Sequence, residues 1–149
     1  MTTPDEGAGD RGVPLARLVL GLLLAIVSAV TIEIAGFLVL AGVDALTGTR
    51  SSAVATAVLD AAGAAGWFVA GGVAYEVVRE GVAVVIVAVV PLIIALLILL
   101  AGVSGAHLLV WGGLLGVIAY AVALGVVTCL GGAAWARHLR PSPSIDSRP

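Results

Sequence analysis

The sequence predicts an all-α protein, a bundle of four transmembrane helices, and two observations lead to this class. Apolar residues make up 61% of the 149 residues and charged residues 11%, against roughly 45–50% and ~25% in soluble domains. The apolar residues gather in four long runs, at residues 18–42, 54–78, 82–103 and 109–134. At about 1.5 Å per residue, a helix formed by any of these runs can cross a hydrocarbon core of ~30 Å. So short a chain cannot hide this much apolar surface in water, so we expect residues 15–136 to be embedded in a lipid bilayer.

The N-terminal segment, residues 1–14, is rich in Gly, Thr, Pro and acidic residues and is expected to be disordered. The run that follows it, residues 18–42, resembles the apolar part of a signal peptide, with a weak cleavage site ending at Ala29. Cleavage there would leave an apolar stub, because the run continues through Leu40. We therefore expect this run to be retained as the first transmembrane helix, followed by a turn-rich loop at residues 43–52.

The second run, residues 54–78, is rich in Ala and Gly and contains Asp60, so its insertion into a bilayer is marginal by composition. The seven arginines, in a chain without lysine, decide whether it spans. With four spans, every arginine except Arg50 lies on one side of the membrane. With three spans, two arginines lie on the side of the N-terminus and five on the opposite side, which inverts the preferred orientation. The positive-inside rule therefore predicts four spans with both termini in the cytoplasm.

The third run follows the second after only three residues, 79–81, so the two runs are expected to form a tight hairpin. Pro91 lies near the centre of the third run and predicts a helix kink, which a bilayer tolerates, or a hinge. In the fourth run, Trp111 and Trp135 are about 36 Å apart along a helix, as expected for two interfacial anchors that bracket one bilayer. Residues 137–149, with three prolines, are expected to form a disordered cytoplasmic tail.

Small residues at helical spacing predict how the helices pack, because close approach replaces the hydrophobic effect inside a membrane. The helix-packing candidates lie on the second and fourth runs: Ala62, Gly66, Ala70, Ala74, Gly112 and Gly116. The second helix is therefore expected to be central and to contact two others. The third run is almost entirely Val, Ile and Leu, and offers little means of specific packing.

Two carboxylates well inside the apolar runs, Glu33 and Asp60, are the candidate proton or cation site. His107 belongs to the same site, because it lies on the same side, in the outer hairpin between the third and fourth runs. Glu33 and Asp60 lie about 13 Å and 9 Å below the outer end of adjacent antiparallel helices, so they can approach each other. Two such groups can share one proton and exchange it for a cation. The alternative is structural: Glu33 bonds a neighbouring helix and Asp60 is solvated or caps a turn. Trp67 lies mid-membrane, where Tyr120 is a possible neighbour.

Other classes of function lack their residues. No basic stripe is present, which excludes a nucleic-acid partner, and the single cysteine, Cys129, excludes an intramolecular disulfide. No catalytic, nucleotide-binding or metal-binding motif occurs, so we expect no enzyme activity, no cofactor and no metal.

The expected function is that of a small, non-enzymatic, polytopic protein of the plasma membrane. It would serve as an assembly or accessory subunit, either as a homo-oligomer or in a larger complex. The alternative is a small proton- or cation-linked transporter that uses Glu33 and Asp60. A lysine-free chain rich in Ala, Val and Gly is compatible with a prokaryotic source.

Overall fold

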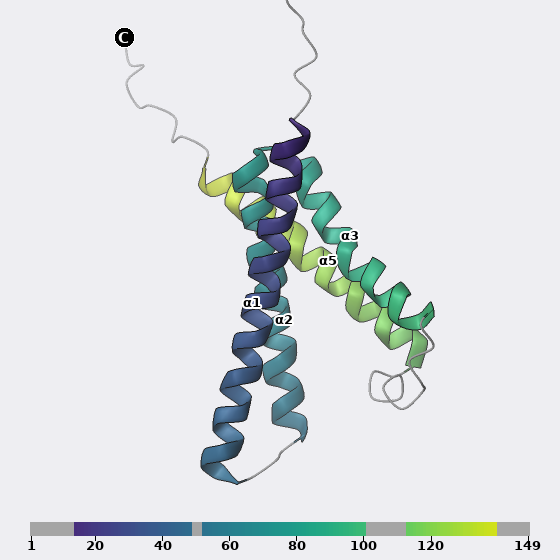
Figure 1. Cartoon of the computed structure of the whole chain (residues 1–149). Helices are drawn as coiled ribbons and strands as arrows, with labels where there is room; N and C mark the ends of the chain where they lie inside the picture. The colour runs from purple at the N-terminus through teal and green to yellow at the C-terminus, as the bar shows by residue number, and fades with distance from the viewer. Residues whose placement is uncertain (1–13, 49–51, 101–112, 140–149) are drawn as a thin grey trace, which may run out of the picture.

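The computed structural model describes residues 14–48, 52–100 and 113–139, and these residues are almost entirely helical. The helices are α1 (Leu15–Thr47), α2 (Ser52–Val78), α3 (Gly81–Leu100) and α5 (Gly113–His138) (Figure 1). By length and composition, α1, α2 and α5 are able to cross a membrane, whereas the apolar stretch Gly81–Leu97 of α3 is somewhat shorter. The prediction of an all-α fold with long apolar helices is confirmed, and the doubtful second run forms a helix of 27 residues.

Two helix ends differ from the prediction. The first helix does not end at residue 42 but continues to Thr47. It ends there because Gly48 adopts a left-handed φ of 63° and its N–H donates to the carbonyl of Asp44. Gly48 thus ends the helix, and Asp44 belongs to its last turn rather than to a loop. At the other end of the chain, Arg137 and His138 lie in the last turn of α5 instead of in a disordered tail. Cations are favourable there because the helix dipole is negative at its C-terminal end.

Several predicted features lie outside the described residues. These are the N-terminal segment 1–13, the end of the third run beyond residue 100, the start of the fourth run before Gly113, the tail from residue 140, and the residues His107, Trp111 and Gly112.

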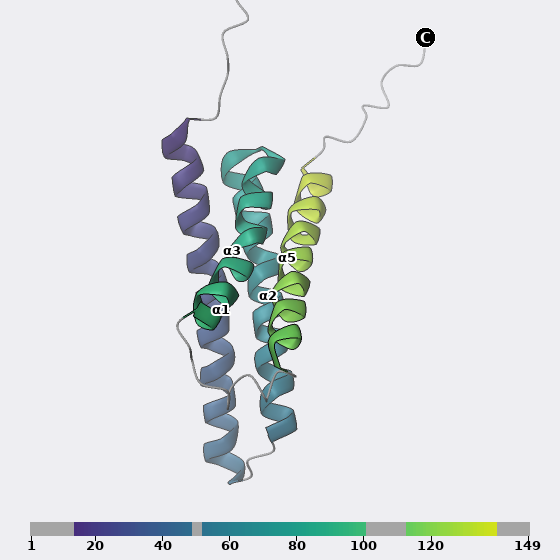
Figure 2. The same ribbon diagram turned by 90° about the vertical axis from the view of Figure 1, so that its right-hand side faces the viewer.

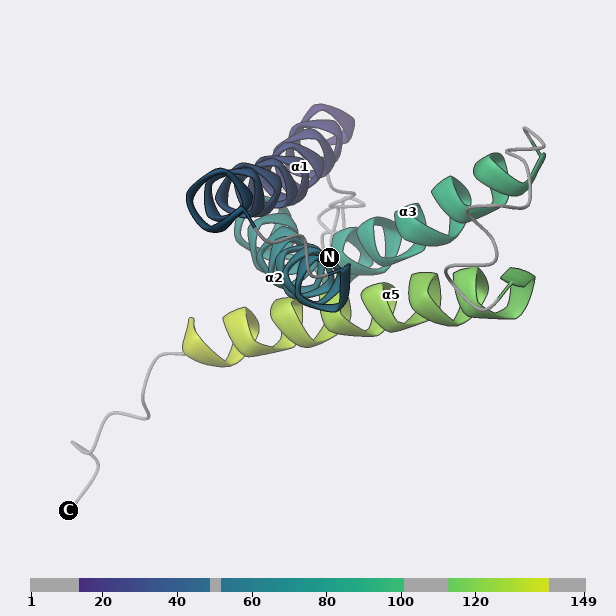
Figure 3. The same ribbon diagram turned by 90° about the horizontal axis from the view of Figure 1, so that it is seen from below.

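The helices form two antiparallel pairs, α1 with α2 and α3 with α5 (Figure 1). The start of α1, the α2–α3 turn and the end of α5 lie at one end of the molecule (Figure 2). From that end the two pairs diverge, as the view along the helices shows (Figure 3). As expected, α2 is central, and it contacts each of the other described helices.

Small residues join α1 to α2. A Cβ added to Gly66 would lie 2.8 Å from the carbonyl oxygen of Ala29, and one added to Gly36 would collide with Ala62. Further along the same stripe, Ala70 and Ala74 are completely buried. The predicted small-residue stripe of α2 therefore lies inside the α1–α2 contact.

Glycines of α5 make the remaining contacts. A Cβ on Gly131 would run into the backbone of Phe68 on α2, and a Cβ on Gly125 would lie 2.7 Å from the carbonyl oxygen of Ala88 on α3. By contrast, Gly116 is only partly buried. We expected α3 to have little means of specific packing, and this is wrong for one of its faces. That face packs closely against α5, because the glycines at the contact belong to α5 and not to α3. That buried face consists of Ala83, Val84, Val87, Ala88, Pro91 and Ala95.

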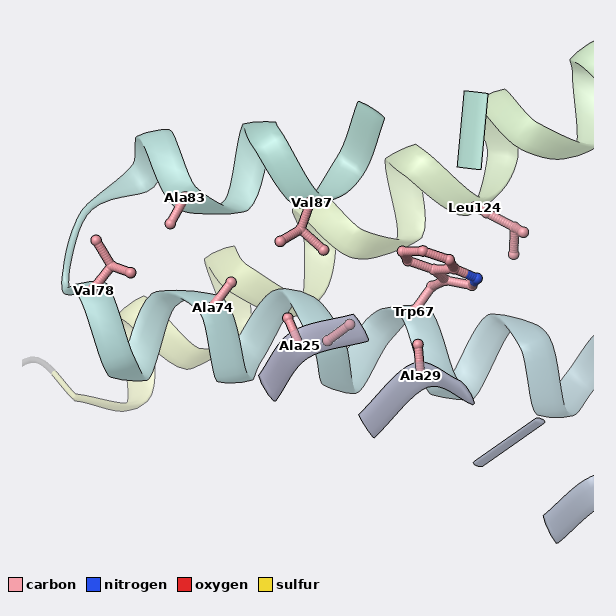
Figure 4. Packing of buried hydrophobic residues seen from close by; sticks show 9 residues of the cluster. Ala25, Ala29, Trp67, Ala74, Val78, Ala83, Val87 and Leu124 are labelled. Atoms are coloured by element: carbon pink, nitrogen blue, oxygen red, sulfur yellow. The ribbon is translucent and has the colours of Figure 1, made fainter. Parts of the chain in front are cut away.

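Pro91 lies within α3, which continues on both sides of it. The centre of the packed core is Trp67, which is 5% exposed and lies between Ala29, Val87 and Leu124 from the three other helices (Figure 4). One aromatic side chain of α2 thus contacts the whole bundle.

Candidate functional site

A group of polar side chains from three helices lies beside the Trp67 core. Glu33 comes from α1, Asp60, Gly63 and Trp67 from α2, and Tyr120 from α5; we refer to these five residues as the carboxylate cluster. The indole N–H of Trp67 donates a hydrogen bond of 3.2 Å to Oε1 of Glu33. This bond joins α1 to α2 and turns the Glu33 carboxylate towards the bundle.

Gly63 marks the centre of the cluster. A Cβ built on Gly63 would lie 3.0 Å from the hydroxyl oxygen of Tyr120 and 3.9 Å from Oε1 of Glu33. The hydroxyl of Tyr120 also hydrogen-bonds to the carboxyl group of Asp60. Glu33 and the Tyr120 phenol therefore lie beside Gly63, and Asp60 is joined to this group through the Tyr120 hydroxyl.

The second carboxylate of the cluster is incompletely satisfied. Oδ1 of Asp60 is buried and has no hydrogen-bond partner among the described residues. A buried carboxylate oxygen without a donor is unfavourable, because its lost hydration is not replaced. Glu33, in contrast, is exposed at the surface of the isolated chain.

Helical spacing explains why these side chains meet. Asp60, Gly63 and Trp67 follow each other at intervals of three and four, which places them on one face of α2. Glu33 faces them because α1 and α2 run antiparallel and pack closely through Gly36 and Ala62.

The sequence predicted part of this cluster. Glu33 and Asp60 do approach the same region, and Trp67 and Tyr120 both belong to it. His107 lies outside the described residues. Gly63 was not singled out from the sequence, although its spacing from Asp60 and Trp67 is a signal that would have identified it. No group of three His, Cys, Asp or Glu side chains suited to a metal ion occurs in the described part of the chain.

A second polar cluster lies at the end of the molecule that holds the start of α1 and the end of α5. Nε of Arg17 donates to the carbonyl oxygen of Val77 at 2.7 Å. Glu76 accepts from Arg79, three residues further along the chain, at 2.6 Å, and from the indole N–H of Trp135 at 3.0 Å. We call Arg17, Glu76, Arg79 and Trp135 the charged end. Trp135 is 44% exposed there.

The described helices define a class, an all-helical protein with three helices long and apolar enough to cross a membrane. Comparison of the chain with protein-family models, with curated proteins and with solved structures found no match. What the chain does must therefore be inferred from its own residues.

Proposed function

We propose that this chain is a multi-pass protein of the cell membrane whose carboxylate cluster binds and releases a proton or a small cation, as the site of a small proton- or cation-linked transporter. The observation that carries the proposal is the buried, unpartnered Oδ1 of Asp60, which lies beside Tyr120 in a cluster that also holds Glu33. A group of this kind needs a partner that the described chain does not provide.

Four spans with both termini in the cytoplasm fit this proposal. At 20 residues, α3 measures about 30 Å and is also long enough to cross a hydrocarbon core. Four antiparallel crossings place the charged end on one side of the bilayer. The positive-inside rule then assigns that side to the cytoplasm, because six of the seven arginines belong to it.

The chemistry of the cluster favours a mobile proton. An ionised carboxylate within hydrocarbon costs a few kcal/mol on insertion scales, so it normally pairs or marks an ion pathway. No arginine of the described helices lies at the level of Glu33 and Asp60. A proton or a cation that enters the cluster would supply the positive charge that is missing at this level.

The depth of the cluster in the bilayer indicates which membrane face lies nearer to it. Glu33 lies about 24 Å along α1 from Arg17, Asp60 about 24 Å along α2 from Glu76, and Tyr120 about 22 Å along α5 from Trp135. If a core of ~30 Å begins at the charged end, all three lie within about 8 Å of its opposite face. A proton or an ion would therefore have the shortest path to the cluster from that side of the bilayer.

Glu33→Gln tests this function. Glutamine keeps a side-chain oxygen for the indole N–H of Trp67 but cannot exchange a proton or bind a cation by charge. We expect the variant to fold and to lose proton flux in proteoliposomes loaded with a pH-sensitive dye. Glu76→Gln, at the charged end, is the matched control and should retain flux. Unchanged flux in the Glu33→Gln protein would remove the transport proposal.

A non-enzymatic assembly or accessory subunit is the second candidate. The exposure of Glu33 favours it, because lipid cannot hydrate a carboxylate and a second copy or a larger complex could cover it. The small-residue stripe of α2 no longer supports this role, since α1 already covers it. An assembly subunit would retain its complex, measured by co-purification, in the Glu33→Gln protein. A homo-oligomer is compatible with both functions, because four helices enclose little volume.

A further inference from the structure

We propose that the Glu33 carboxylate is a docking point for a transmembrane helix of another protein, one that carries a lysine or arginine at the same depth. The inference rests on the proposed function, because it needs Glu33 to lie inside the bilayer, and it names a protein partner for that site. It differs from the assembly role considered above, whose complex would survive Glu33→Gln, since here the carboxylate itself makes the contact.

Glu33 has an exposed and unbalanced charge, although it belongs to the carboxylate cluster. The indole N–H of Trp67 donates to Oε1, but this donor is neutral, and Glu33 as a whole stays exposed. The arginines of the described helices are Arg17, Arg79 and Arg137, and they lie at the end of the molecule where α1 begins and α5 ends (Figure 2). Lipid tails cannot hydrate a carboxylate, so an ionised Glu33 needs a cation from outside the chain.

The side of α1 that carries Glu33 has the spacing of a helix-packing surface. Alternating intervals of three and four residues separate Val30, Glu33, Phe37, Leu40 and Asp44, which we call the α1 seam. One helix packs along another with this spacing. The first three residues of the seam are exposed, and a groove runs along α1 from Phe37 to Gly48. A partner helix can therefore lie along the seam, over about 21 Å, with a basic side chain opposite Glu33.

A second copy of the chain does not supply the missing cation. The chain has no lysine, and copies that obey the positive-inside rule all place their cytoplasmic arginines at the far end of the helices from Glu33. Arg50 follows α1 in the sequence, but α1 ends at Thr47, which is already about 21 Å along the helix from Glu33. Two copies would also bring two like charges to one level. Charge complementarity therefore selects a different protein, with a basic residue in the outer part of its span.

A synthetic leucine-rich transmembrane peptide with one arginine about five residues from one end is the probe, since five residues span about 8 Å. The same peptide with glutamine at that position is the control. The full chain and each peptide are reconstituted in phosphatidylcholine vesicles, and association is measured by fluorescence energy transfer between them. We expect the arginine peptide to associate at least about tenfold more tightly than the glutamine peptide. Glu33→Gln should abolish this preference, and Glu76→Gln should retain it.

Two tryptophan substitutions test the docking surface without changing a charge. Ala41→Trp places a bulky side chain in the groove beside the α1 seam and should weaken association with the arginine peptide. Ala35→Trp lies two residues before Phe37, on the opposite side of α1, and should leave the association unchanged. Both alanines are exposed, so neither substitution enters the described core. Equal association of the two variants would overturn this assignment of the surface.

Two outcomes separate this inference from the proposed function. An arginine peptide that associates no better than the glutamine peptide, with a protein whose flux requires Glu33, overturns the partner and leaves the transport site standing. Preferential association that requires Glu33, in a protein without flux, supports the partner and removes the transport proposal.

Discussion

Trp67 has two tasks that a substitution can separate. Its ring fills the centre of the bundle, and its N–H satisfies Glu33. Trp67→Phe keeps an aromatic ring but removes the donor, so we expect a loss of about 1–2 kcal/mol of stability, measured by chemical unfolding in detergent. Trp135→Phe also loses a bond to a glutamate, but at an exposed position, and should cost less. Equal losses in the two variants would contradict the central role of Trp67.

Single residues differ in how far the sequence reveals their role. Glu33 and Asp60 were identifiable because a carboxylate within an apolar run is costly and needs a reason. The bond from Trp67 to Glu33 was not predictable, because it depends on the rotation of α1 about its own axis. Gly63 became significant only when Tyr120 was found opposite it, on a helix distant in sequence.

At the scale of elements, the crossing of α2 and α5 depends on the absence of a side chain. A Cβ on Gly131 would collide with the Phe68 carbonyl, so Gly131→Leu should force the helices apart. Overpacking of this kind typically costs 1–3 kcal/mol or somewhat more. We expect a lower midpoint of thermal unfolding in detergent than for Gly42→Leu, whose position is open. Comparable midpoints for the two leucine variants would show that the close crossing is not essential.

The α2–α3 turn contains an arginine in an unusual backbone conformation. Arg79 has a φ of 63°, and its N–H caps α2 by donating to the Tyr75 carbonyl. This left-handed region costs non-glycine residues about 1–2 kcal/mol, and more for β-branched ones. Because the exposed Glu76 ion pair contributes little, Arg79→Gly should equal or exceed the parent in stability. Arg79→Val should fall about 1–2 kcal/mol below the glycine variant. A valine variant as stable as the glycine variant, in the same unfolding assay, would rule out this strain.

The sequence located every described helix but not all of its ends or contacts. Composition and length identify an apolar helix well, because the requirement to cross a bilayer is strong. The end of α1 was missed because Asp44 and Thr47 resemble loop residues, although neither prevents a helix from continuing to Gly48. The packing of α3 was missed because its specificity lies in Gly125 and Gly132 of the partner helix α5.

At the scale of the whole molecule, orientation decides whether the cluster serves as an outward-facing site. The start of α1, the α2–α3 turn and the end of α5 lie at one end of the molecule (Figures 1 and 2). Bonds from Arg17 to Val77 and from Trp135 to Glu76 tie these three segments together. If one of these segments lay on the other side of the bilayer from the rest, its bond would break. Arginines would also move against the positive-inside preference.

We therefore expect reporter tags placed before Met1 and after Pro149 to be protected from a membrane-impermeant reagent in intact cells. A cysteine introduced at Thr49, between α1 and α2, should be labelled under the same conditions, in a Cys129→Ala background that removes the native thiol. Labelling of the two tags from opposite faces would mean an odd number of crossings. The carboxylates of α1 and α2 would still be neighbours, but the side from which ions reach them would no longer follow from the arginines. Labelling of both tags from outside would keep an even number of crossings and turn the cluster towards the cytoplasm, so the same measurement also decides from which side the proposed site would be reached.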